Sequence, residues 1–396
     1  MILIKRKEVQ MKQLNIGLVG YKFMGKAHSN ALARLPMFFD LDADIRMKCI
    51  CGRDEQWVAQ SAKKFGWDEY ETSWEKLIAR EDIDVIDITA PSNTHCDIAI
   101  AAAQNGKHVF CEKPLALNLA DARRMLEAAQ TAGIKHQIGF NYRFAPAIQL
   151  AKKIISEGKL GTIRHVRAYY LQDFITDPEF PLVWRLQKSI CGSGSLGDLG
   201  AHFIDLARFL VGDFKSVMGM QKTFIKSRPI VERMEGLTAN AQADAPRGEV
   251  DVDDGSVFVA EFENGALGVF EATRFSAGHK NDLFIEVSGD RGSIKFTFER
   301  MNELEYFSAD DEEGLQGFHL IQASEGGHPY MTHWWPVGHV IGYEHTFVHE
   351  FYEFMQSIAL DKPTMPDFRD GVECSRIIEA VELSAQRRAM VDIQSL

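Results

Sequence analysis

The sequence predicts an α/β protein with two domains, a doubly wound parallel sheet over residues 1–140 and an α+β domain over residues 141–396 whose large open sheet is mixed or antiparallel. Three observations support this prediction. The chain has 396 residues, which is long for a single core. Apolar strand patterns alternate with helical patterns up to about residue 140. Beyond that point, long runs of alternating polar and apolar residues are typical of strands with one exposed face.

In the first domain, each predicted strand is a short apolar run, and helical patterns lie between the strands. The strands are expected at 14–20, 45–51, 84–90, 108–111 and 134–140, and the helices at 24–35, 55–66, 73–80, 95–105 and 118–132. The stretches SNTH and NLAD place capping side chains before two of these helices. Residues 1–11 precede the first strand and are expected to form a disordered extension.

The second domain begins with a helix and continues mainly as strands. Helices are expected at 145–157, 344–359 and 370–390, strands at 162–173, 256–275 and 283–298, and loops at 229–254 and 309–343. Asn264-Gly265 predicts that the second strand run folds into a hairpin, and the third run turns at Gly289–Gly292.

Composition and charge argue against several classes of partner. The net charge of −12 disfavours binding to nucleic acid or to an anionic membrane. No apolar run approaches the roughly 18 residues that a membrane span needs, and the N-terminal MILIKRKEVQ is too short in apolar residues for a secretion signal. The six cysteines form no C-x-x-C pair, which favours free thiols in a reducing compartment. The predicted location is therefore the cytoplasm.

The stretch LNIGLVGYKFMGK runs from a predicted strand through a glycine turn into a helix. A dinucleotide-binding turn has the pattern G-x-G-x-x-G, in which the middle glycine lets the backbone approach a pyrophosphate. Here the three positions hold Gly20, Lys22 and Gly25. The lysine ammonium can replace that close approach by charge, and the helix N-terminus still offers free N–H groups. The alternative is an ordinary strand-to-helix turn.

The end of the second strand leaves the choice between NAD and NADP open. An acidic residue there accepts hydrogen bonds from the ribose hydroxyls of NAD, whereas a nearby arginine accommodates the 2′-phosphate of NADP. Gly52 stands where the acid is expected, Arg53 favours NADP, and Asp54 can still serve NAD. A solvated pair at the start of a helix is the alternative for Arg53 and Asp54.

Lys113 in the stretch CEKPLA follows a buried strand directly. The carboxyl ends of parallel strands are where doubly wound folds bind ligands, so Lys113 is a candidate site residue. Pro114 comes next, and the bond between the two residues can be cis. Taken alone, a solvated loop lysine is the alternative.

The stretch GSGSLGDLGAHFIDLARFLVG spaces Asp198, His202 and Asp205 so that they share one face of a helix. Histidine titrates near neutral pH and a carboxylate can orient it, so this pairing suits general acid–base catalysis. Two alternatives remain. One is a helix-start acid beside a histidine satisfied in the core, and the other is a metal site, although no further ligand motif accompanies it.

The glycine turn, EKPLA and GDLGAHFIDL occur in an order that resembles the Gfo/Idh/MocA oxidoreductases, the glucose–fructose oxidoreductase and inositol dehydrogenase family. The resemblance runs from about residue 14 to the C-terminus. Further stretches, among them FMGKAHSNA, NYRFAPAIQLAKKII and YLQDF, look closest to the levoglucosan dehydrogenase branch of the family. The resemblance implies a Rossmann domain followed by a substrate-binding and oligomerisation domain, and a homodimer or homotetramer.

The resemblance also implies site residues, and it implies no metal. Catalysis falls on Lys113, Asp198 and His202. With the turn residues included, contacts to the cofactor are expected from Gly20, Lys22, Phe23, Met24, Gly25, Arg53, Thr89, Pro91, Asn93, His95, Glu112, Lys113, Pro114, Asn141, Trp184 and Arg185. Contacts to the substrate are expected from Lys113, Tyr142, Arg143, Asp173, Asp198, His202 and His333. For His333 and its neighbour Trp334, packing or an oligomer contact is the alternative.

The implied function is transfer of a hydride from a ring secondary alcohol of a sugar or cyclitol to NAD or NADP. His202 would take the hydroxyl proton, Lys113 would stabilise the developing alkoxide, and Asp198 would hold a substrate hydroxyl. A levoglucosan-type anhydrosugar oxidised at C3 is the specific expectation, with inositols and glucosides oxidised at C3 as rivals. A redox-neutral enzyme with tightly bound NAD is a further alternative. A non-catalytic dinucleotide-binding sensor is disfavoured because all three catalytic residues are present.

Overall fold

The computed structural model describes residues 11–231 and 245–396. Its first sheet has six parallel strands in the order β3-β2-β1-β4-β5-β6. The strands are β1 (Lys12–Val19), β2 (Ala43–Cys51), β3 (Glu69–Glu71), β4 (Val85–Ile88), β5 (His108–Glu112) and β6 (His136–Gly139). The chain leaves β1 towards β2 on one side and returns to β4 on the other. This reversal of strand order between β1 and β4 marks the place where doubly wound sheets bind ligands.

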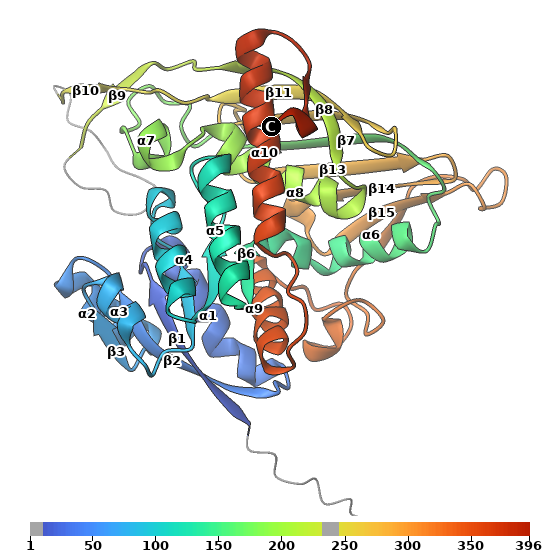
Figure 1. Ribbon diagram of the computed structural model, residues 1–396. Coiled ribbons are helices and arrows are strands. Elements are labelled where there is room, and N and C mark those ends of the chain that lie inside the picture. The colour runs from blue at the N-terminus through green and yellow to red at the C-terminus, as the bar shows by residue number, and fades with distance from the viewer. Residues whose placement is uncertain (1–10, 232–244) are drawn as a thin grey trace, which may run out of the picture.

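The helices of this sheet cover its two faces (Figure 1). They are α1 (Phe23–Phe38), α2 (Glu55–Phe65), α3 (Trp74–Ala79), α4 (His95–Gln104) and α5 (Leu119–Ala132). Local chemistry fixes their ends. Asn118 accepts a hydrogen bond from the N–H of Asp121 and so caps α5, and Gly133 ends that helix in the left-handed conformation. The stretch SNTH instead forms a 3₁₀ turn, Ser92–Thr94, and gives α4 no side-chain cap.

The second sheet has nine strands in the order β16-β15-β14-β13-β7-β12-β11-β8-β17. The strands are β7 (Ile163–Leu171), β8 (Phe214–Lys222), β11 (Gly255–Phe262), β12 (Leu267–Thr273), β13 (Asp282–Gly289), β14 (Gly292–Thr297), β15 (Glu303–Ser308), β16 (His319–Gln322) and β17 (Val391–Asp392). Strands β7 and β12 run parallel, and the other neighbours run antiparallel, so the sheet is mixed. Strands β9 (Ser227–Pro229) and β10 (Arg247–Glu249) pair separately.

Five helices connect this sheet to the rest of the molecule: α6 (Pro146–Ser156), α7 (Lys188–Cys191), α8 (Ala201–Leu210), α9 (Tyr343–Ala359) and α10 (Phe368–Arg387). Helix α10, red in Figure 1, packs on α5 of the first sheet and on β8 of the second. Helix α9 packs on α1. Helix α8 contacts β7 and β13 and continues a π-helical turn, Leu196–Gly200. The last part of the chain therefore returns to cover the first sheet.

One face of the second sheet is buried and the other is exposed, as the alternating sequence predicted. On β11 and β12, Phe258 and Phe270 point inward and are almost completely buried. Their sequence neighbours Val257, Val259 and Val269 are about half exposed. Because side chains alternate along a strand, these residues define one inward and one outward face.

The fold class is confirmed, and the differences from the expected elements are local. The strands β3, β8 and β15 were not predicted, and part of the expected loop 309–343 forms β16. The hairpin at Gly265 is present, but the Phe262 N–H bonds to the Ala266 carbonyl, so the loop is longer than two residues. Within the expected loop 229–254, residues 247–249 form β10, which pairs with β9 at the start of the loop. The expected extension lies, apart from Met11, outside the described residues. No helix in the described part of the chain is long and apolar enough to cross a membrane.

Candidate active site

The glycine turn joins β1 to α1 at the point where the strand order reverses. Gly20 has a φ of +112°, and a side chain on Gly25 would place its Cβ 2.1 Å from the Gly20 carbonyl oxygen. The Thr89 hydroxyl, from the end of β4, donates to the carbonyls of Val19 and Gly20 at 3.1 Å each. The turn therefore needs glycine at both positions, and the hydrogen bonds of Thr89 hold its backbone in place.

The N-terminus of α1 suits a dinucleotide phosphate. Its first turn contains no acidic residue, and Lys22 stands at the N-cap without a capping side-chain bond. Phe23 is 53% exposed, and Met24 is partly buried in the next position. Free N–H groups at a helix start and an adjacent ammonium both favour an anion. The residues present thus fit NAD, and Gly20, Lys22 and Gly25 are the ones that would hold its pyrophosphate.

At the end of β2, an aromatic ring occupies the position where an acidic side chain was expected. A Cβ on Gly52 would lie 2.1 Å from the Tyr21 ring, so glycine is required there. Asp54 caps α2, because its carboxylate accepts a hydrogen bond from the Trp57 N–H. Arg53 is exposed beside them. Asp54 therefore has a structural use, which weakens the expectation that it serves the ribose of NAD.

Two loops next to the turn are joined by His95. Pro91 and Asn93 lie in the loop after β4, in and just before the 3₁₀ turn Ser92–Thr94. One ring nitrogen of His95 lies 3.0 Å from the carbonyl oxygen of Pro114, and the other lies 2.9 Å from that of Ala90. His95 is 1% exposed. Both ring nitrogens of His95 therefore hold the loops together, and its contact with the cofactor stays a prediction.

Lys113 reaches across to the second domain. Its Nζ donates to the Asp198 backbone carbonyl at 2.7 Å and to Asp198 Oδ1 at 3.1 Å, and its bond to Pro114 is cis. Asp198 lies in the π-helical turn before α8. The carboxylate of Asp253 holds the start of that turn by accepting from the N–H groups of Gly194 and Leu196. Lys113 and Asp198 are therefore brought together as the sequence predicted.

Two arginines also contact the Asp198 carboxylate. Arg185 was among the residues expected at the site from the sequence, and Arg274 was not. Arg274 Nη2 donates to Asp198 Oδ2 at 3.2 Å, and Arg185 Nε lies 3.7 Å from the same oxygen. Partial burial raises the pKa of Asp198, but the charges of Lys113, Arg274 and Arg185 outweigh it and hold the pKa far below its usual range. Arg185 stacks on Trp184, which keeps it in place. Three cations around one carboxylate leave the site with net positive charge.

His202 lies beside this cluster on the first turn of α8, and its ring is only 6% exposed. Tyr142 stacks on it at 4.2 Å and donates or accepts a 2.7 Å hydrogen bond with Tyr170. Burial lowers the pKa of His202 well below its usual value, and the charge of Lys113 lowers it further. Within the described residues, Nδ1 of His202 has no hydrogen-bond partner. The imidazole is therefore neutral near pH 7 and able to accept a proton.

The structure contradicts several finer expectations around α8. Arg143 bonds Asp205 through two hydrogen bonds of 2.6 and 2.7 Å and Asp370 through one of 3.0 Å, so this buried arginine is an ion-pair partner and not a substrate contact. Asp205 consequently lies apart from the Asp198 carboxylate. The ring of Tyr142 stacks on the ring of His202. Asn141 is buried and donates to Thr346 on α9. Among the described residues, no three His, Cys, Asp or Glu side chains are grouped closely enough for a metal.

The expected sugar contacts outside the two motifs also differ. His333 stacks on Phe39 at 4.2 Å, at the far end of α1. That helix has 16 residues. The helix therefore extends about 24 Å from the glycine turn. His333 lies at its C-terminal end, away from the turn. Trp334 packs there too, and its Nε1 donates to His349. Asp173 accepts from the Gly278 N–H and from Lys280 in the loop after β12, and its contact with a sugar stays a prediction.

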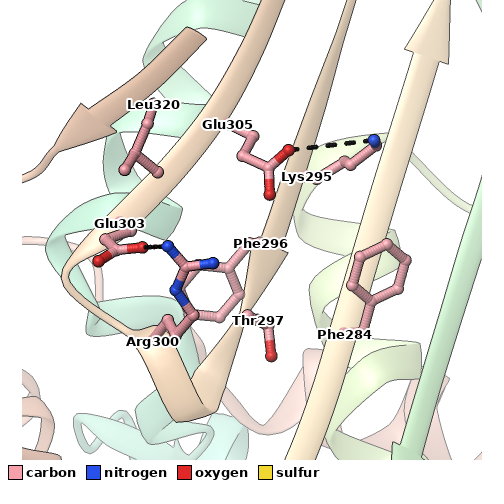
Figure 2. Close-up of a pocket in the computed structure, with 8 residues that line it drawn as sticks. All are labelled: Phe284, Lys295, Phe296, Thr297, Arg300, Glu303, Glu305 and Leu320. Atoms are coloured by element: carbon pink, nitrogen blue, oxygen red, sulfur yellow. Dashed lines mark ion pairs between the residues drawn. The ribbon is translucent and has the colours of Figure 1, made fainter. Parts of the chain in front are cut away.

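A small cavity on the outward face of the second sheet is separate from this site. Its volume is about 30 Å³, and Figure 2 shows that charged side chains surround it. Arg300 pairs with Glu303, and Lys295 lies 4.0 Å from Glu305. None of the residues around Asp198 lines this cavity.

Comparisons with known proteins agree with this geometry. A model of the "Oxidoreductase family, NAD-binding Rossmann fold" matches residues 14–140, and a model of the "GFO/IDH/MocA C-terminal domain" matches residues 148–295. The chain belongs to the Gfo/Idh/MocA oxidoreductase family. This Gfo/Idh/MocA chain is therefore an NAD-binding oxidoreductase, and NAD when bound supplies the hydride acceptor.

Relatives within the Gfo/Idh/MocA family include sugar and inositol dehydrogenases. Levoglucosan dehydrogenase of Pseudarthrobacter phenanthrenivorans is 41% identical over 389 residues, 98% of this chain and 100% of the relative. The scyllo-inositol 2-dehydrogenase (NAD(+)) of Bacillus subtilis is 32% identical and covers 59% of this chain and 61% of its own. The crystal structure of an oxidoreductase domain protein from Kribbella flavida is 47% identical in sequence with a TM-score of 0.91. The match covers 97% of this chain and 100% of that chain. The structure of levoglucosan dehydrogenase in complex with NADH and levoglucosan is 41% identical in sequence with a TM-score of 0.91. The match covers 96% of this chain and 100% of that chain.

In this Gfo/Idh/MocA chain, replacing Arg274 by methionine is expected to lower kcat/KM for the substrate by about 10- to 100-fold, the range for loss of a hydrogen bond between charged groups. The loss should appear because Asp198 keeps Lys113 and Arg185 but is less firmly held. Steady-state kinetics with Arg274→Met and the charge-retaining Arg274→Lys would measure it. Unchanged kinetics in Arg274→Met would show that Arg274 only fills space.

Proposed function

We propose that this chain oxidises a ring secondary alcohol of an anhydrosugar of the levoglucosan type, at C3, with NAD as the hydride acceptor. The observation that carries the proposal is the contact of Lys113 with Asp198 beside the neutral, buried His202. Lys113 directly follows β5 of the sheet whose β1 leads into the glycine turn, whereas Asp198 and His202 come from the π-helical turn and α8 of the second domain. The relative named for levoglucosan supports the choice of substrate class, because its similarity covers nearly the whole chain.

The roles of the three residues follow from their charges. The hydroxyl of the oxidised carbon must lose its proton as its carbon loses a hydride, and the neutral imidazole of His202 takes that proton. Lys113, together with Arg185 and Arg274, provides positive charge where the alkoxide develops. The carboxylate of Asp198 stays ionised, so it can accept a hydrogen bond from a neighbouring sugar hydroxyl and orient the ring.

Initial rates of NAD⁺ reduction test this function. Levoglucosan, myo-inositol, scyllo-inositol, glucose and methyl glucoside would be compared at equal concentrations, with NADP⁺ in parallel. The proposal predicts the highest kcat/KM with levoglucosan and NAD⁺. A higher kcat/KM with an inositol or a glucoside would assign the chain to that substrate instead. No net turnover with any sugar, together with NAD that copurifies with the protein, would favour a redox-neutral reaction.

We also propose that the outward face of the second sheet pairs two copies of the chain. The outward side chains of β8, β11 and β12 form an apolar surface composed of Met218, Met220, Val257, Val259, Leu267 and Val269, each at least 46% exposed. Adjacent apolar side chains on one exposed face are typical of an interface. Light scattering at micromolar concentration should give the mass of a dimer or tetramer, and a single-chain mass would contradict the proposal.

A further inference from the structure

Behind Lys113, a buried histidine bridges two carboxylates. His28 on α1 places Nδ1 3.0 Å from each carboxylate oxygen of Asp87 on β4, and its Nε2 2.9 Å from Oε1 of Glu112 on β5. Asp87 and His28 have no exposed surface, and Glu112 is 6% exposed. The strand register explains the grouping: Asp87 pairs with Phe110, and Glu112, two residues further along, lies on the same face of the sheet.

The geometry makes His28 a cation. When both carboxylates are ionised they only accept hydrogen bonds, so both ring nitrogens donate and His28 is an imidazolium. Burial raises the pKa of Asp87, whereas the charge and the hydrogen bond of His28 lower it. Burial lowers the pKa of His28, but the charges and hydrogen bonds of Asp87 and Glu112 outweigh burial and raise the pKa to about 10. His28 is therefore charged throughout the working range of most enzymes.

Aromatic rings and one further acid enclose this cluster. Phe110, Phe347 and Phe351 lie with their ring centres 5.1–5.5 Å from the His28 ring. Glu350 on α9 is completely buried, and within the described residues neither of its oxygens has a hydrogen-bond partner. Burial, followed by the charge of Glu112, raises the pKa of Glu350 well above its usual value, so Glu350 is neutral. The enclosed groups are thus one cation, two carboxylates and one neutral acid.

Glu112 connects this cluster to the catalytic lysine. While Oε1 of Glu112 accepts from His28, its Oε2 accepts a 3.2 Å hydrogen bond from the backbone N–H of Lys113. Gly139 packs against the same carboxylate, since a Cβ there would lie 2.9 Å from Oε1. The carboxylate is held between His28 and the Lys113 backbone. Both carboxylate oxygens of Glu112 are thus used within the protein, and a contact of Glu112 with the nicotinamide stays a prediction.

We propose that His28 is a positioning residue for the reaction: by bridging Asp87 and Glu112 it fixes the backbone of Lys113 where the lysine ammonium reaches Asp198. The proposal rests on the proposed function for its kinetic readout only. The connection runs through contacts that join α1, whose N-terminus suits the cofactor, to the lysine that acts on the substrate. The competing explanation is that the bridge only stabilises the fold.

Two variants separate these explanations by their charge. His28→Gln removes the cation and leaves the two buried carboxylates facing each other beside Glu350. One carboxylate then takes up a proton at low pH, and as pH rises through that raised pKa both ionise and repel. Glu112 is thereby pushed from the Lys113 N–H. In the double variant with Asp87→Asn, an uncharged amide replaces one of the two carboxylates at every pH, so Glu112 keeps its charge and its bond to Lys113.

The expected result is a kcat for His28→Gln that is about 100-fold below wild type at pH 8, the scale for a misplacement of about 1 Å, and that partly recovers as pH falls. The double variant should regain most of the loss. KM for NAD⁺ should change little. A kcat equal to wild type at every pH, with only a lower melting temperature, would overturn the proposal. So would a double variant that is no better than the single one.

A readout without turnover keeps this test independent of the substrate. Lys113 would be labelled with an amine-reactive reagent at pH 8 and the extent measured by peptide mass spectrometry. In wild type, Lys113 is held on Asp198 and should react slowly; in His28→Gln it should react several-fold faster, and the double variant should return to the slow rate. Equal labelling in all three proteins would contradict the positioning role. If wild type oxidises no sugar but the labelling differs as expected, the proposed function fails and the positioning role stands.

Discussion

Replacing Lys113 by alanine is expected to lower kcat/KM for the sugar by about 10²- to 10³-fold, the usual cost of removing one group that stabilises developing negative charge. The substitution should leave the fold intact. Asp198 keeps its contacts with Arg274 and Arg185, so no buried charge loses its last partner. The effect therefore falls on the reaction and not on folding. Steady-state kinetics together with the melting temperature would measure both.

The control for Lys113→Ala is Lys64→Ala, which removes an exposed lysine in the last turn of α2. The control should retain wild-type kinetics. Titration of NADH fluorescence would show whether Lys113→Ala still binds cofactor, and the dissociation constant should change by no more than a few fold. A Lys113→Ala enzyme with wild-type kcat/KM would remove Lys113 from the mechanism.

Replacing His202 by alanine is expected to reduce kcat by about 10²- to 10⁴-fold, the range for loss of a general base. The pH dependence of kcat/KM identifies His202 as the base more specifically than the loss of activity does. Because burial lowers the pKa of His202, the base form persists below pH 6.5 and is lost only as pH falls through the lowered value. Wild-type kcat/KM should therefore stay level down to below about pH 6.5 before it declines. The remaining activity of His202→Ala should lack this acid limb.

The matched histidine control is His319→Ala, since His319 is exposed on β16 and forms an ion pair with Asp311, away from the Asp198 cluster. It should keep both kcat and the acid limb of wild type. An acid limb that remained in His202→Ala would assign the titration to another group. In that case His202 would serve only to pack against Tyr142.

The main fold, and Lys113, Asp198 and His202 as candidate site residues, could be predicted from the sequence because their signals are local. Strand–helix alternation gave the first sheet, and regular alternation gave most of the second. Lys113 directly follows β5, and Asp198 lies in the glycine-rich turn that leads into α8, so both stand where one element gives way to the next and a charged side chain can reach a ligand. Residue types and positions of this kind are visible without tertiary information.

The remaining site residues depend on tertiary contacts that spacing does not reveal. Asp205 was placed with Asp198 by assuming a regular α-helix, but a π-helical turn precedes α8, and Asp205 pairs with Arg143 instead. Arg274 follows the end of β12 without any motif, and only the parallel pairing of β12 with β7 locates that strand end near the site. Similarly, His28 reaches Glu112 only because β4 and β5 are adjacent.

We propose that this chain moves a hydride from C3 of an anhydrosugar to NAD while His202 removes the proton. Incubation with levoglucosan deuterated at C3 and NAD⁺, followed by mass spectrometry of the reduced cofactor, tests it most directly. Hydride transfer from C3 predicts one deuterium in the NADH that forms and a slower rate than with unlabelled sugar. Reduced cofactor that carries no deuterium would contradict oxidation at C3, and absence of reduced cofactor would contradict the proposed substrate.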